Sequence, residues 1–250
     1  MKKLLIIAAL VAFTVWGLWF IAVPESVIVR ALNFESGIFS VEASGFEKGL
    51  FYNFRIGNIG LKRAGKKLIS ADGITGSVNL FSLARLKTEI KFKGGISGGR
   101  LNGTAVFKGK HRDIDIFISG ADLAELVAGT KGRIEAEAHI KDAAGDAKFS
   151  IDNAEITPVG LIGLDIPSLN FHTARGALDF AGQSLDLRSF ALEGDGVYAR
   201  LKGGIKGGSV NMELELMPEG EMDPVVAAFI AKYKVSPGYY KIPVKRELKL

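Results

Sequence analysis

The stretch that decides the fold is RIEAEAHIK, residues 133–141, in which polar and apolar residues alternate at every position. On a helix, Ile134 and Ala138 would share one side while Ala136 and Ile140 fell on another, so no coherent apolar stripe would form. On a strand, these four side chains point one way and the polar side chains point the other. Burial of a shared face outweighs helix propensities that differ by roughly tenths of a kcal/mol per residue. The stretch therefore predicts a strand.

The same alternation recurs along the rest of the chain after Asn33. It is found in residues 88–93, 113–118, 147–151, 197–202 and 209–216. Glycine-rich dipeptides or tripeptides that predict turns lie between such segments, at Gly94-Gly95, Gly98-Gly99, 194–196, Gly203-Gly204 and Gly207-Gly208. Turn signals at roughly ten-residue spacing are typical of antiparallel hairpins. The pattern predicts an antiparallel meander.

Short helices are expected at only three places in this β-rich body: residues 79–86, residues 121–129, and residue 223 to about residue 232. The last has Asp223 as N-cap and Pro224 at the first helical position. Its apolar stripe, made by Val226, Phe229, Ile230 and Tyr233, is expected to cover one end of the sheet.

The predicted strands each have one apolar side, and so few helices cannot cover a long sheet. The fold class expected is therefore mainly β, with a long, curled antiparallel sheet that is either sandwich-like or an open groove. Small residues on the inner face, such as Ala136, Ala138 and Ala199, leave space for a groove but also allow two sheets to approach closely. The candidate groove-lining residues are Ile116, Phe149, Leu201 and Leu214.

The N-terminus predicts a membrane anchor. Leu4 to Val23 is an uncharged, apolar run long enough to span a bilayer core of roughly 30 Å. Lys2 and Lys3 place the N-terminus in the cytoplasm, and Trp16 and Trp19 lie toward the outer end as interfacial anchors. The run is longer than a cleavable signal peptide requires, so an uncleaved signal-anchor is expected, with cleavage as the alternative.

This topology divides the chain into four expected parts. They are cytoplasmic residues 1–3, transmembrane residues 4–23, a juxtamembrane helix at 24–33, and a β-rich domain outside the cytoplasm at 34–250.

Charge is distributed unevenly. Residues 62–112 contain twelve Lys/Arg and two acidic residues, whereas residues 113–196 contain fifteen Asp/Glu and six Lys/Arg. Two readings stay open: a solvated polar face whose sign drifts, or a basic half that faces anionic headgroups or an acidic partner.

No segment predicts catalysis, a cofactor or a metal site. Cysteine is absent, and the three histidines, His111, His139 and His172, are far apart and expected on polar strand faces. Acidic pairs such as Asp113/Asp115 are neighbours on exposed faces, which is typical of solvation rather than acid–base chemistry. Aromatic and basic residues interleave only loosely, so a nucleic-acid platform is not expected.

Four segments together resemble a known family: GLFYNFRIGNIGL (49–61), GGISGGRLNGTAVF (94–107), DLAELVAGTKGRIEAEAHI (122–140) and SPGYYKIPVKREL (236–248). With the basic start and the apolar run, the layout is similar to the type II secretion system protein N family (GspN) and, more distantly, to AsmA-type proteins. The resemblance covers essentially the full chain.

This resemblance implies a non-enzymatic accessory of the type II secretion machinery, without cofactors. It would sit in the bacterial inner membrane, with its β domain in the periplasm contacting other machinery proteins. AsmA-type kinship implies instead a groove that carries or shields lipid acyl chains between membranes. The family supplies no catalytic residue to carry over.

Overall fold

The structure is a computed structural model of the whole chain. It describes residues 33–36, 39–49, 52–63, 66–83, 85–126, 130–142, 144–156, 171–182, 184–220 and 224–247, together with Val11, Phe13, Thr14, Gly17, Glu25 and Val29. These residues belong to two compact units. Unit 1 comprises residues 1–96 and 100–110, and unit 2 comprises residues 97–99 and 111–250.

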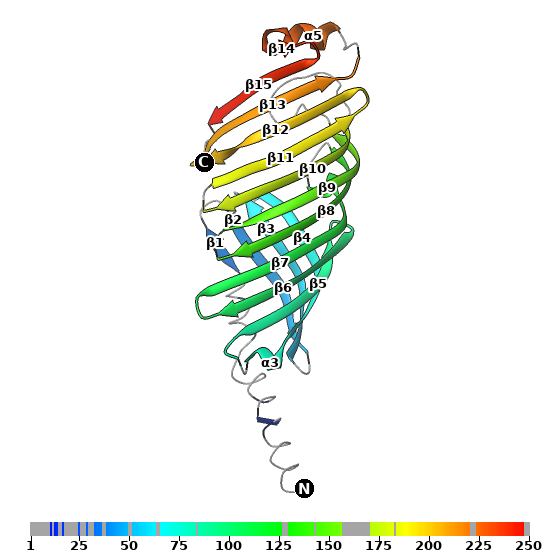
Figure 1. Cartoon of the computed structure of the whole chain (residues 1–250). Helices are drawn as coiled ribbons and strands as arrows, with labels where there is room; N and C mark the ends of the chain where they lie inside the picture. The colour runs from blue at the N-terminus through cyan, green and yellow to red at the C-terminus, as the bar shows by residue number, and fades with distance from the viewer. Residues whose placement is uncertain are drawn as a thin grey trace. The chain divides into compact units, whose positions relative to one another are not determined.

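Unit 1 is an antiparallel sheet in which strands pair in chain order (Figure 1). Its elements are β1 (Phe34–Ser36), β2 (Phe39–Lys48), β3 (Asn53–Arg63), β4 (Lys66–Val78), helix α3 (Leu80–Leu83), β5 (Thr88–Ile96) and β6 (Gly99–Lys108). Strands β1 to β5 pair antiparallel, and β6 is next in order beside β5.

Unit 2 is also a meander, except that its last two strands are exchanged. Its elements are β7 (His111–Asp122), α4 (Leu123–Leu126), β8 (Thr130–Lys141), β9 (Ala144–Ile156), β10 (Phe171–Ala181), β11 (Ser184–Gly194), β12 (Val197–Lys206), β13 (Ser209–Pro218), α5 (Pro224–Ile230), the 3-10 helix η3 (Ala231–Tyr233), β14 (Lys234–Ser236) and β15 (Tyr239–Glu247). The longer β15 pairs with β13, and the three-residue β14 lies outside it.

The stretch RIEAEAHIK lies in β8, and its predicted alternation is confirmed. Ile134, Ala136, Ala138 and Ile140 are partly buried, whereas Glu135 and Glu137 are exposed. The prediction of a mainly β, antiparallel fold with few short helices is likewise confirmed, because every described strand from β7 to β15 pairs antiparallel with its neighbours.

Two of the predicted glycine turns are wrong. Gly94-Gly95 lies inside β5 and Gly203-Gly204 lies inside β12, while the turns fall at Ser97-Gly98 and Gly207-Gly208. The internal glycines are explained by close approach rather than by chain reversal. A Cβ on Gly94 would lie 2.8 Å from Ile74 Cγ1, and one on Gly204 would lie 2.5 Å from the Leu185 carbonyl oxygen.

The three predicted helices exist but are shorter than expected. Residues Ala121 and Asp122 belong to β7, and the Asp122 carboxylate accepts a hydrogen bond from Ala124 N–H at 2.9 Å, capping α4. The stripe predicted on the last helix is partly wrong. Val226 and Ile230, four residues apart, are buried, whereas Phe229 is half exposed because seven residues of helix present only a narrow buried face.

The core of unit 2 lies at one end of its strands, where α5 packs against the sheet. Buried residues from β9 to β15 form one apolar cluster with Leu123, Val226 and Ile230. Ile230 has no exposed surface and Val226 is 2 % exposed, so both side chains of α5 are part of this core.

The predicted anchor at 4–23, the juxtamembrane helix at 24–33, and the anchor residues Lys2, Lys3, Trp16 and Trp19 lie almost entirely outside the described residues. In the parts of the chain that the structure describes, no helix has the length and hydrophobicity needed to cross a membrane.

Two of the cross-strand glycines in unit 2 face phenylalanine rings and make a sharp stability prediction. Gly145 pairs with Phe180, and Gly176 pairs with Phe149. A Cβ on Gly145 would also overlap the backbone carbonyl oxygen of His139, whereas one on Gly176 would overlap only the movable end of a ring. We expect Gly145→Ala to cost about 2–3 kcal/mol and Gly176→Ala about 1 kcal/mol. Urea unfolding of the two variants measures both values, and equal costs would contradict the backbone clash.

Candidate functional site

The apolar face of the unit 2 sheet is built from four rows of cross-strand partners. Each row takes one inward side chain per strand, because register and pleat bring alternate residues to the same face. Row 1 is Ala121, Ile134, Ile151, Ala174, Leu192, Ala199, Leu216 and Tyr240; row 2 is Ile118, Ala136, Phe149, Gly176, Phe190, Leu201, Leu214 and Ile242. Row 3 is Ile116, Ala138, Ala147, Leu178, Leu187, Gly203, Met212 and Val244; row 4 is Ile114, Ile140, Gly145, Phe180, Leu185, Ile205 and Val210.

Burial falls from row 1 to row 4. All of row 1 except Ile134 is buried, and its members from β9 to β15 belong to the core cluster. Every member of row 4 is only partly buried, although most are large and apolar. The face therefore offers a continuous apolar surface that is buried at one end of the strands and partly accessible at the other.

The four predicted lining residues all lie on this face, but not in one environment. Leu214 is buried in the core, and Phe149 and Leu201 pack against it. Ile116 lies in row 3, outside the core cluster, and is partly buried. The accessible part of the face is centred on row 4, which the sequence analysis did not single out.

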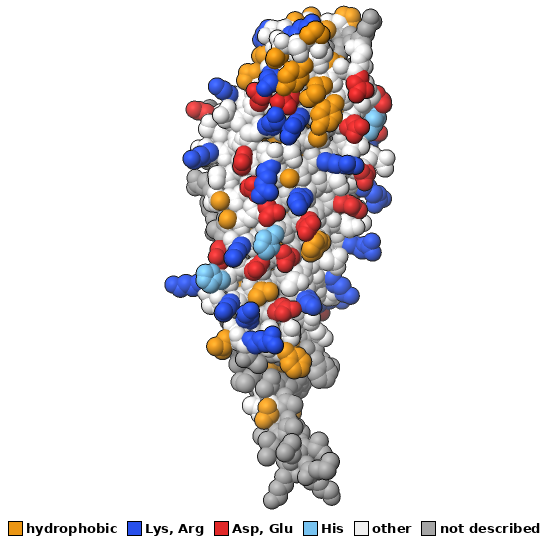
Figure 2. All heavy atoms as spheres, viewed as in Figure 1, with side chains coloured by type: hydrophobic (Ala, Val, Ile, Leu, Met, Phe, Trp, Pro, Cys, Tyr) orange, Lys and Arg blue, Asp and Glu red, His pale blue; other side chains and the backbone are white. Residues whose placement is uncertain are grey.

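The opposite face of the sheet carries interspersed cations and carboxylates, as Figure 2 shows over β7 to β12. Several pair across strands: Lys131 with Glu155 at 2.6 Å, Lys241 with Glu213 at 3.2 Å, and Arg188 with Asp179. Exposed pairs of this kind contribute about 0–1 kcal/mol each. This face is solvated, in agreement with the first reading of the charge pattern for this unit.

Glu215 differs from the exposed ion pairs of this face because it is only 5 % exposed. Its carboxylate accepts a hydrogen bond from Lys202 Nζ at 2.7 Å, and Lys241 Nζ lies 3.8 Å away. The hydrogen bond from Lys202 lowers the pKa of Glu215 below the ordinary value of 4.5, against a smaller opposing effect of burial.

This depressed pKa predicts acid sensitivity. Because the folded-state pKa lies below the unfolded-state value, Glu215 stabilises the fold above pH 4.5, and this stabilisation is lost as the pH falls through the folded-state pKa. We expect the urea midpoint of the wild-type chain to fall more steeply than that of Glu215→Gln below pH 4.5. Parallel acid profiles for the two proteins would show that the ion pair is energetically neutral.

A second polar cluster joins Asp113 and Asp115 of β7 to His139 of β8. His139 Nδ1 lies 2.7 Å from an Asp115 oxygen and 3.6 Å from an Asp113 oxygen. The hydrogen bond to Asp115 raises the pKa of His139. One ligand atom from each residue lies within 4.8 Å of the others, so the three form the kind of group that can hold a metal ion. All three are roughly half exposed, which is equally typical of a surface ion-pair network.

The sequence analysis separated these three residues, because only the β7–β8 register reveals that His139 lies directly opposite Asp115. The other two histidines also pair with aspartates: His111 with Asp142 at 3.2 Å and His172 with Asp195 at 2.9 Å. The three histidines remain apart, as the sequence predicted.

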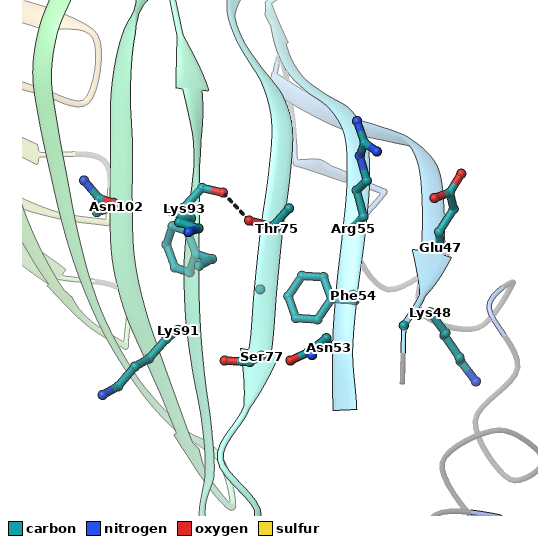
Figure 3. A pocket seen from close by; sticks show the side chains of 13 residues that line it. Glu47, Lys48, Asn53, Phe54, Arg55, Thr75, Ser77, Lys91, Lys93 and Asn102 are labelled. Carbon is teal, nitrogen blue, oxygen red and sulfur yellow. Dashed lines mark hydrogen bonds between the residues drawn. The ribbon is translucent and has the colours of Figure 1, made fainter. Parts of the chain in front are cut away.

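Unit 1 has a hollow of about 590 Å³ at the end of its strands where β2 ends and β3 begins (Figure 3). One row of its lining runs across four strands as Glu47, Arg55, Thr75 and Lys93, and a second contains Asn53, Ser77 and Lys91. Thr75 Oγ1 donates to the Lys93 carbonyl oxygen at 3.5 Å. The lining combines cations and hydroxyl or amide groups with the rings of Phe54 and Phe92, so the hollow has both a polar and an apolar part.

Comparison with known proteins finds no matching family model, curated protein or solved structure.

Proposed function

We propose that this chain is a non-enzymatic accessory of the type II protein secretion machinery, anchored in the bacterial inner membrane with its β domain in the periplasm. The observation that carries the proposal is the resemblance of the four segments between residues 49 and 248, together with the apolar run at 4–23. The antiparallel, mainly β architecture supports it, since the resemblance implies a Gly-rich β body.

A protein-contact position is available on the solvated face of unit 2. Phe117 of β7 points away from row 3 and is 47 % exposed among charged neighbours. An exposed aromatic ring surrounded by polar side chains is typical of a binding hot spot. We infer that Phe117 contacts another component of the machinery.

Deletion of the gene in the native host tests the secretion role. Exported proteins should accumulate in the periplasm and disappear from the medium, and the wild-type gene should restore them. Complementation with Phe117→Glu should fail, whereas Glu135→Gln on the neighbouring strand should succeed, because it perturbs the same face without removing the ring. Normal secretion in the deletion strain would refute the proposal.

Acyl-chain binding is the second candidate function, and the half-buried row 4 favours it. Exposed apolar surface is unfavourable in water by about 25 cal/mol per Å², so a lipid chain lying along Ile114, Ile140 and Phe180 would gain free energy by covering them. The buried row 1 would then be the closed end of the binding surface, and row 4 its entrance.

Two adjacent residues of β7 give a matched test of lipid binding. A photo-crosslinking amino acid at position 116 faces the apolar side, and one at position 117 faces the polar side. In the full chain purified from membranes, mass spectrometry should find acyl-chain adducts at 116 but not at 117. No adduct at 116 would exclude lipid binding there and leave the secretion proposal untouched.

A further inference from the structure

The connection between β4 and β5, residues 79–87, exposes two large apolar side chains. Phe81 and Leu86 are each 87 % exposed, more than any other large hydrophobic residue among those described. They lie on either side of a buried serine, Ser82, on a segment that contains helix α3. We call residues 79–87 the apolar loop.

The apolar loop is held in place by hydrogen bonds, so its exposure does not come from fraying. Ser82 Oγ donates to the Asn79 carbonyl oxygen at 2.6 Å and accepts from Glu89 N–H at 3.0 Å. The Ser82 carbonyl oxygen accepts from the N–H groups of Arg85 and Lys87 at 3.0 and 3.1 Å. Asn79 Oδ1 accepts from Phe81 N–H at 3.1 Å. The fold thus fixes Phe81 and Leu86 toward solvent.

Leu86 also has a strained backbone. Its φ is +54°, in the left-handed region that glycine and asparagine occupy readily and a branched apolar residue avoids. An exposed leucine in this conformation contributes neither to the core nor to the turn. A role in binding accounts for both its exposure and its backbone.

Two cations flank Leu86 in the sequence, and a third follows on β5. Arg85, Lys87 and Lys91 are exposed, and Lys91 also lines the hollow in Figure 3. The nearby carboxylate of Glu89 is engaged by Asn79 Nδ2 at 3.4 Å and by Lys91 Nζ at 3.9 Å. Exposed apolar side chains with cations nearby in the chain complement an anionic bilayer surface, where the apolar side chains insert and the cations contact phosphates.

A hydrogen bond brings the end of the unit 1 strands that carries the apolar loop close to the predicted anchor. Glu25, two residues after the apolar run 4–23, accepts a hydrogen bond through Oε1 from the backbone N–H of Lys48 at 3.3 Å. Lys48 is the last residue of β2. Because β2 and β4 run in the same direction, on either side of the antiparallel β3, they finish at the same end of the sheet, where the apolar loop begins.

We propose that the apolar loop, with Lys91, is a docking site for the anionic bilayer in which the N-terminal segment is embedded. Phe81 and Leu86 insert at the interface, and Arg85, Lys87 and Lys91 bind lipid phosphates. The docking fixes unit 1 against the membrane surface. This inference rests on the membrane anchor of the proposed function, but it requires neither the secretion role nor acyl-chain binding by unit 2.

Because the chain has no cysteine, single labels can be placed cleanly. Full-length Phe81→Cys and Thr75→Cys proteins would each be labelled with the environment-sensitive fluorophore NBD. Each would be reconstituted into two kinds of vesicle, one containing phosphatidylglycerol and the other made of phosphatidylcholine alone. Thr75 is an exposed control on β4, close to the same edge but outside the apolar loop. The label at 81 should be quenched by doxyl groups on the acyl chains of phosphatidylglycerol vesicles, and the label at 75 should not.

Two variants in the labelled background separate docking from folding. Replacing Arg85, Lys87 and Lys91 with serine should lower the ratio of docked to undocked protein on the order of 100-fold, at about fivefold per cation. Leu86→Asn should lower quenching while leaving the thermal midpoint no lower, because asparagine accepts the left-handed backbone. Either absence of quenching at 81 or equal quenching in neutral vesicles would overturn the proposal.

Discussion

Replacing Ile242 with aspartate is expected to unfold unit 2. Ile242 is 1 % exposed and lies in row 2 opposite Leu214, inside the core cluster that includes Val226 and Ile230 of α5. Among the described residues its core cluster is apolar, and an uncompensated buried charge costs about 3–5 kcal/mol in addition to the lost apolar contacts. Urea unfolding of the full chain in detergent can be followed by circular dichroism. The variant should lose the signal of unit 2 already at the lowest urea concentrations, with no separate unfolding transition for that unit.

The matched control is Lys245→Asp, three residues further along β15. Lys245 is exposed, so the same new carboxylate should change the unfolding free energy by no more than about 0.5 kcal/mol. Hydrogen exchange would locate the damage in Ile242→Asp to β12, β13 and β15. A stable Ile242→Asp protein would mean that water reaches row 2 and that the core assignment is wrong.

Truncating Phe171 should have the second-largest effect. Phe171, at the start of β10, is 2 % exposed and belongs to the same cluster as Ala174 and Leu192. Removing a buried ring costs its transfer free energy and leaves a cavity, about 3–5 kcal/mol in total. We expect Phe171→Ala to lower the thermal midpoint of unit 2 by several degrees or more, measured by differential scanning calorimetry.

Phe117→Ala provides a control with identical chemistry. That ring is 47 % exposed on the solvated face, so its removal should cost about 1 kcal/mol or less. If both truncations lowered stability equally, the two faces of the sheet would be equally buried. That result would contradict the assignment of rows 1 to 4 to a buried, apolar face.

Alternation along single strands was predictable because it is a local property of the chain. Residues 133–141 alternate without interruption, and β8 shows the same pattern of burial. Rows 1 to 4 were not predictable, because they depend on register. In β11 the inward positions shift from Leu187 to Phe190 at an irregularity opposite β12, which moves the alternation by one residue.

Polar clusters escaped prediction for the same reason. Asp113 and Asp115 are separated from His139 by more than twenty residues, and only the β7–β8 pairing brings them together. Glu215 reads as an exposed residue in an alternating strand, but it is covered by Lys202 and Lys241 from the strands on either side. The exposed side chains of the apolar loop carry no sequence signal that distinguishes them from those of a buried helix.

Pairing each strand mainly with its predecessor has a kinetic consequence. In both units, successive hairpins close with connections that are mostly short, so forming each pair loses little loop-closure entropy and needs no distant part of the chain. Such low contact order favours fast folding. A chain whose residues emerge in order from residue 34 onward could add strands one at a time to the growing sheet, with the strands of unit 1 paired before those of unit 2 had emerged. Only the end of unit 2 would have to wait, since β14 and β15 exchange places and α5 contributes Val226 and Ile230 to the same core as Ile242.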